Sequence, residues 1–301
     1  MNIACVDNMS DRNRRIGGAI VGGAVGTAVP ALTLYDSFRK VHKNDAIMTS
    51  NVLQKLMPNV DTFENTMNNV GNILKETGLD KKGVKVTAFA DTPEMNKQLK
   101  NIIDANVKPS NALNRRLNNN YFNIFKYGGN AAYFSETKDV VIHSKNTYSS
   151  VYHELGHAMN ANGNIFTKAL QQARVLTPFG ISVVAPIALA VGIFHKVDET
   201  KPAEAKSKKE KTLDFIANNA GKLTLASYMP LVAEEALASY RGINQAKKYV
   251  TKGVLSGLKK NYITALGTYV GMALTVTGLT ALGVKIAQHN MKPKKTKELA
   301  S

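Results

Sequence analysis

Three stretches of the chain are almost free of charged residues: 16–35, 175–194 and 261–285. A helix needs about 20 apolar residues to cross the roughly 30 Å hydrocarbon core of a bilayer. Each stretch has that length, so the pattern predicts transmembrane helices, with a re-entrant hairpin as the alternative for 175–194. We therefore expect a multi-pass integral membrane protein whose partners include the lipid bilayer.

The first apolar stretch is rich in glycine. Gly18, Gly22 and Gly26 are spaced by four residues and fall on one face of a helix, where small residues allow close helix packing in a bilayer. Two other interpretations are a signal peptide, because arginines precede the apolar residues, and a glycine-rich loop. A membrane helix following a polar segment, 1–15, is the favoured one.

Residues 36–174 have the mixed pattern of a water-exposed domain. Apolar residues three and four apart predict a helix capped by Asp61 and ended by Gly78, and Thr92 before a proline predicts a second helix start. Alternation predicts a strand at 84–90. The asparagines at 118–120 indicate a break between elements.

From residue 121 the apolar period changes to two. The segments 121–127, 131–135 and 139–143 are separated by turn residues and predict a small antiparallel sheet. We therefore expect a mainly helical α+β fold with a small antiparallel sheet and hydrophobic membrane-associated helices. Beyond the second apolar stretch, 195–260 is predicted to be a charged loop and a helix, and 286–301 a basic tail.

The composition limits the partners and the chemistry. A net charge of +17 suits an acidic partner such as anionic lipid or nucleic acid. The lysines are spread over loops and accompany no nucleic-acid-binding motif, so no nucleic acid is expected. The only cysteine, Cys5, excludes an intrachain disulfide and a cysteine-based zinc site.

Residues 151–160 contain an HExxH motif in a segment with helical spacing. His153 and His157 lie four residues apart, so one helix face presents both imidazoles to one metal ion. Glu154 is placed to take a proton from a metal-bound water, which is the chemistry of hydrolysis by zinc. The alternative is a helix with two surface histidines. The apolar residues that flank the motif, and Gly156 in the helix interior, argue against this alternative. They favour a packed site that another segment approaches closely.

A catalytic zinc usually has three protein ligands. The longer motif with a third histidine is absent, so we expect the third ligand to be a histidine, aspartate or glutamate further along the chain. The best candidates are the paired carboxylates Glu234 and Glu235 in 233–241. The alternative is that both glutamates lie on the solvated side of a helix start. Tyr240 and Arg241 follow as candidates for stabilising an oxyanion.

These motifs resemble the membrane-embedded gluzincin metallopeptidases typified by HtpX and the CAAX prenyl proteases. The resemblance covers roughly 84–242 and rests on HELGH at 153–157, an ExxA sequence beginning at Glu235, and an asparagine-alanine segment at 129–134. It implies a gluzincin-like core, one Zn²⁺ per chain held by His153, His157 and Glu235, and Glu154 as general base. It also implies that a peptide or protein substrate adds as an extended strand.

Two features depart from that family. Its aspartate four residues after the glutamate ligand is Ser239 here, so a hydrogen bond that orients a histidine is expected to be missing. The second intervening membrane segment, at 212–232, is poorly hydrophobic. The expected function is a membrane-bound zinc metalloendopeptidase. The alternative is a non-catalytic membrane-interaction protein with a structural or vestigial metal site.

Overall fold

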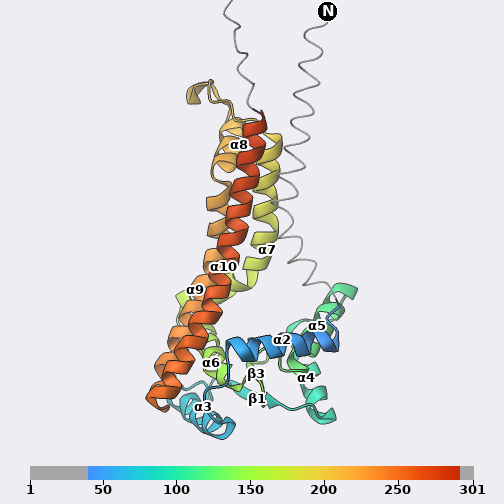
Figure 1. The fold of residues 1–301 in the computed structure, drawn as a ribbon, viewed down its shortest axis with the longest axis vertical. Helices are drawn as coiled ribbons and strands as arrows, with labels where there is room; N and C mark the ends of the chain where they lie inside the picture. Colours follow the sequence, from blue (N-terminus) through green and yellow to red (C-terminus); the bar gives the residue numbers. More distant parts are fainter. Residues whose placement is uncertain (1–39, 292–301) are drawn as a thin grey trace, which may run out of the picture. The chain divides into compact units, whose positions relative to one another are not determined.

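The computed structural model describes residues 40–291, which divide into two compact units (Figure 1). The predicted segments 1–15 and 16–35, and most of the basic tail, lie outside the described residues. The fold is mainly helical with one small sheet, as the sequence indicates. Three helices, α7 (Ile165–Phe194), α9 (Ala220–Ala246) and α10 (Lys252–Met291), contribute residues to both units.

The larger unit comprises 36–175 and 230–270. We call it the site unit, because it holds the HExxH helix. Besides its parts of α7, α9 and α10, its elements are α2 (Lys43–Leu56), α3 (Phe63–Thr77), β1 (Lys85–Phe89), α4 (Pro93–Asn106), α5 (Ala112–Lys126), β2 (Ala132–Phe134), β3 (Asp139–His143), a 3₁₀ turn (Tyr148–Ser150) and α6 (Val151–Ala161).

Local side-chain chemistry sets the limits of the early helices. The Thr62 hydroxyl accepts a hydrogen bond from the Asn65 backbone N–H, so Thr62 caps α3, and the prediction of Asp61 was wrong by one residue. Gly78 ends α3 with a positive φ of 66°, as predicted. The predicted start of α4 at Thr92 is confirmed.

The sheet has the order β1-β3-β2 and is mixed, so the predicted antiparallel sheet was wrong in its topology. β1 pairs with β3 in parallel, whereas β2 pairs with β3 antiparallel and forms an edge. The strand predicted at 84–90 is β1, and it takes the place expected for 121–127. A parallel partner joins the sheet only through a long connection, which alternation within a short segment does not reveal.

Residues 121–127 lie mainly in α5, and the asparagine-rich break is part of the same helix. Phe122 and Phe125 are three residues apart on a helix and pack with the core around β3. The buried Asn118 donates hydrogen bonds to the Asp104 carboxylate and the Val107 carbonyl. Contacts to distant residues therefore satisfy an asparagine that local preference would place in a turn.

The two faces of β3 organise the two cores of the site unit. Val140 and Ile142 point to one side, where they join the core that includes Leu155 of α6. Val141 points to the other side and joins the core with Phe125 of α5. All five residues of β3 are buried, so the strand fixes α6 on one face of the sheet.

The second unit comprises residues 176–229 and those from 271 onward. It holds the remaining parts of α7, α9 and α10, a 3₁₀ turn (Ala203–Ala205) and α8 (Lys208–Asn218). Its core is formed by small and branched side chains: Ala188, Leu189, Ile193, Ala220, Val284 and Ala287.

Within the described part of the chain, one helix is long and apolar enough to cross a membrane, Lys252–His289 of α10. Buried helices of water-soluble proteins meet the same criteria, and 33 % of its apolar window is buried inside the protein. The segment 175–194 belongs to the continuous helix α7 and is not a re-entrant hairpin. Within it, Val183–Phe194 is a shorter apolar segment. The described residues thus contain one candidate span and do not support a multi-pass topology.

Helices α6 and α9 approach each other through two glycines. A Cβ atom on Gly156 would lie 2.6 Å from the carbonyl carbon of Ala238, and one on Gly242 would lie 2.7 Å from that of Tyr152. Side chains cannot occupy such space. The expectation that Gly156 admits another chain segment is thus confirmed, and that segment is α9.

Gly156→Ala should therefore separate the two helices. We expect it to lower the free energy of unfolding by at least about 1–3 kcal/mol, the usual cost of overpacking. The matched control is Gly71→Ala in α3, where a Cβ meets nothing within 4 Å. It should stabilise by about 0.5–1 kcal/mol, because alanine is the better helix former. Chemical denaturation measures both, and equal effects would contradict the role assigned to Gly156.

Candidate metal centre

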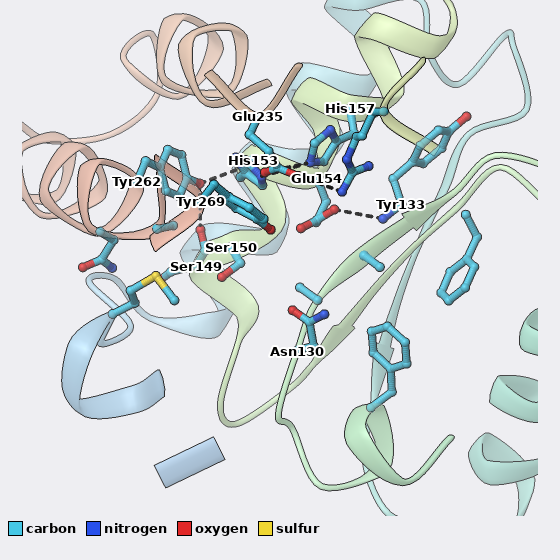
Figure 2. Close-up of a pocket in the computed structure, with 18 of the residues that line it drawn as sticks. Asn130, Tyr133, Ser149, Ser150, His153, Glu154, His157, Glu235, Tyr262 and Tyr269 are labelled. Carbon is cyan, nitrogen blue, oxygen red and sulfur yellow. Dashed lines mark hydrogen bonds and ion pairs between the residues drawn. The ribbon is translucent and has the colours of Figure 1, made fainter. Parts of the chain in front are cut away.

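The site begins with the two histidines of α6, whose rings meet edge to face with their centroids 4.5 Å apart (Figure 2). Their Nε2 atoms are 3.0 Å apart. α6 begins after Ser150, which makes no capping hydrogen bond. The 3₁₀ turn that precedes it, Tyr148–Ser150, follows Thr147.

The structure brings Glu235 of α9 to both histidines. Its Oε2 atom lies 3.1 Å from Nε2 of His153 and 3.7 Å from Nε2 of His157. Zinc at about 2.0–2.1 Å from each atom of a tetrahedral set would hold those atoms about 3.3 Å apart. The three observed separations bracket this value, so the donor set fits a zinc ion in type and in spacing.

The other nitrogen of each ring is held by a residue of α9. His153 Nδ1 lies 3.0 Å from the Ser239 hydroxyl, and His157 Nδ1 lies 2.8 Å from Glu234 Oε1. Such contacts orient a histidine so that Nε2 faces the metal. The expectation that Ser239 leaves this hydrogen bond unmade was wrong, because a hydroxyl reaches the ring where the helices are so close.

Burial also prepares His157 for ligation. Burial removes the imidazole from water and holds its pKa well below the usual value. The positive charge of Arg174 lowers the pKa further. A neutral imidazole is the form that binds a metal. His157 is therefore in its ligating form at neutral pH.

Glu154 lies between the histidines and the edge strand β2. Its Oε2 atom accepts a hydrogen bond from the Tyr133 backbone N–H at 2.9 Å (Figure 2). Burial raises the pKa of its carboxyl to about 7, although the charges of His153 and Arg174 oppose the rise. A group with this pKa can both accept and donate a proton near neutral pH.

Three further residues of the site were not predicted from the sequence. Arg174 of α7 contacts both glutamates, with Nη2 2.8 Å from Glu235 Oε1 and Nε 3.3 Å from Glu234 Oε2. Asn160 donates a hydrogen bond to Glu234 Oε1. The Tyr262 hydroxyl accepts from the His153 N–H and donates to the Ser149 carbonyl. The one sequence feature that could have indicated any of them is Arg174, a single arginine directly before the apolar stretch 175–194.

The site opens into a cavity of about 350 Å³ in the site unit, lined on different sides by β2, α6 and α10. Tyr269 lies on its wall, and its hydroxyl is hydrogen-bonded with Glu235 (Figure 2). The oxyanion candidates from the sequence are elsewhere. Tyr240 is 64 % exposed, and Arg241 lines a different cavity.

Comparisons with protein-family models, with curated proteins and with solved structures give no match. The geometry of this site therefore carries the functional argument.

In the metal-free protein, the raised pKa of Glu154 should appear as a pH-dependent stability. The folded pKa lies above the unfolded one, so the carboxyl destabilises the fold progressively as pH rises from about 4.5 to about 7. Glu154→Gln removes this charge and keeps an acceptor for the Tyr133 N–H. After chelator treatment, the variant should exceed wild type by up to about 3 kcal/mol above pH 7 and match it below pH 4.5. Parallel unfolding profiles across that range would refute the shift.

Ser239→Ala should weaken metal binding without removing a ligand. The change leaves His153 Nδ1 without its partner, and loss of such contacts typically costs about 10- to 100-fold in metal affinity. Competition with a chromophoric chelator measures the zinc affinity. Ser150→Ala, one residue before α6 and without a capping hydrogen bond, is the control. An affinity for Ser239→Ala equal to that of the control would contradict the orienting role.

Proposed function

We propose that the protein is a membrane-associated zinc metallopeptidase. The observation that carries the proposal is the triangle formed by His153 Nε2, His157 Nε2 and Glu235 Oε2, with a buried carboxylate, Glu154, beside it. Two imidazoles and a carboxylate with a further glutamate nearby form the donor set of a catalytic zinc. The resemblance to gluzincins of the HtpX and CAAX prenyl protease type supports the same class.

Zinc bound by these three residues would lower the pKa of a bound water to about 7 and polarise a peptide carbonyl. Glu154 takes up the proton released from the water, since its own pKa lies near neutrality. It then donates that proton to the leaving amine. The Tyr133 N–H holds Oε2 in place, which leaves Oε1 to exchange the proton.

The edge strand β2 supplies a surface for an extended peptide. β3 covers one side of β2, and the other side is free of strands among the described residues. Backbone hydrogen bonds from a substrate strand to the groups of this edge other than the Tyr133 N–H, which Glu154 occupies, would provide affinity that is independent of side chains. Ala132 and Tyr133 also line the cavity, so a peptide on this edge passes the metal ligands.

We place the enzyme at a membrane through α10, the helix of sufficient length and apolar character. A multi-pass topology would need a second span, for which residues 16–35 are the candidate. The competing function is a membrane-interaction protein in which the metal only stabilises the fold. The two functions differ in the role of Glu154, which is a general base in the enzyme and has no catalytic role in the membrane-interaction protein.

Detergent-purified protein should contain one zinc per chain. Glu154→Gln should keep the zinc and lose peptide hydrolysis by about 10²- to 10⁴-fold, the usual contribution of a general base. His157→Ala should lose the metal, because it removes a ligand. Metal analysis and cleavage of a peptide library measure the two properties. No zinc in the wild type with metal supplied throughout would overturn the proposal, and zinc without cleavage would favour the structural role.

A further inference from the structure

The two adjacent glutamates of α9 are both candidates for the third metal ligand. Neighbouring residues on a helix point about 100° apart, yet Glu234 and Glu235 are both buried, 0 % and 1 % exposed. Both also lie beside the His157 ring. Glu234 meets Nδ1 on one side, and Glu235 faces Nε2 on the other. A carboxylate is an adequate zinc ligand in either position, so something must fix which glutamate serves.

Arg174 contacts the oxygen of each glutamate that faces away from the histidines. Nη2 lies 2.8 Å from Glu235 Oε1, and Nε lies 3.3 Å from Glu234 Oε2. Each glutamate is left with one oxygen for His157: Glu235 Oε2 on the Nε2 side and Glu234 Oε1 on the Nδ1 side. Neither Glu235 Oε1 nor Glu234 Oε2 has a hydrogen-bond partner among the described residues, so both contacts are ion pairs, made with two carboxylates at once by nitrogens whose spacing the planar guanidinium fixes.

Arg174 also meets the electrostatic requirement of the site. Three carboxylates converge here, those of Glu154, Glu234 and Glu235. With all three ionised, one divalent ion and the Arg174 guanidinium balance their charge. Buried charges of one sign are costly without such compensation.

We propose that Arg174 is a positioning residue that assigns the two glutamates their separate roles, Glu235 as metal ligand and Glu234 as the partner of His157 Nδ1. The inference rests on the proposed metal site and extends it to a residue outside the HExxH and glutamate segments. Without the Arg174 guanidinium, Glu234 is free to turn toward the metal, and Glu235 is free to present either of its oxygens. The two glutamates then become interchangeable.

A double-mutant cycle in zinc affinity tests the assignment. Zinc affinities of the full chain are measured for Glu234→Ala and Glu235→Ala, each with and without Arg174→Gln. With Arg174 present, Glu235→Ala should cost at least about 10-fold more affinity than Glu234→Ala, because it removes a ligand rather than an orienting group. With Arg174→Gln the difference should shrink to less than about 3-fold. A difference that persists would overturn the proposal.

Two further variants separate position from charge and from general damage. Arg174→Lys keeps the positive charge but lacks the planar guanidinium. It should therefore also remove the difference in zinc affinity between Glu234→Ala and Glu235→Ala. If only Arg174→Gln removes the difference, charge alone is responsible and the positioning role is wrong. Arg241 is also on α9 but lines another cavity. Arg241→Gln should therefore leave the difference in zinc affinity between the two glutamate variants unchanged. If the wild type binds no zinc, the proposed function fails. Zinc in the wild type with an unchanged difference in the Arg174 variants refutes only the role of Arg174.

Discussion

The close crossing of α6 and α9 is the constraint on which the rest of the site depends. Gly156 and Gly242 remove two side chains from the contact, and the backbones approach where any Cβ would collide. Only at this separation can the short Ser239 side chain reach His153. The same crossing delivers Glu234 and Glu235 to the two sides of one imidazole. The glycines cost helix propensity, and the buried polar contacts between the helices compensate for that cost.

Those contacts form one connected network, which explains how so many ionisable groups are buried together. Glu234, fully inaccessible to solvent, meets His157, Asn160 and Arg174. A buried carboxylate with fewer partners would take up a proton or destabilise the fold. Burial raises the pKa of the Glu234 carboxyl, and the contacts with Arg174 and Asn160 oppose that rise. Glu154 accepts one backbone hydrogen bond, and burial raises the pKa of its carboxyl to about 7. Burial therefore favours proton uptake at both carboxyls, and the polar contacts set how far each pKa rises.

The sequence predicted the parts of the site that depend on local spacing. The four-residue interval of His153 and His157 defines a shared helix face in any context, and paired glutamates on a later helix pointed to the second half of the site. The orienting contacts could not be predicted, because they join α9 to α6 and α7 across 60 residues or more. The antiparallel pair of β2 and β3 was predicted, but the third strand was assigned to the wrong segment for the same reason. The aromatic residues of α5 suit either period, and only their packing against Phe134 and Val141 decides for a helix.

Helix α10 combines the hydropathy of a membrane span with polar contacts inside the site unit. Its first turns contain Asn261, which donates to the Pro58 carbonyl, and Tyr262, which bridges Ser149 and His153. These polar contacts belong to the interior of the site unit, although the surrounding residues have the hydropathy of a span. A single helix of 40 residues can thus serve a buried site at one end and still be apolar enough for a bilayer. Since the Tyr262 hydroxyl accepts a hydrogen bond from the His153 backbone N–H, the helix that is long and apolar enough for a membrane also contributes to the candidate metal centre, and its position bears on the geometry of His153.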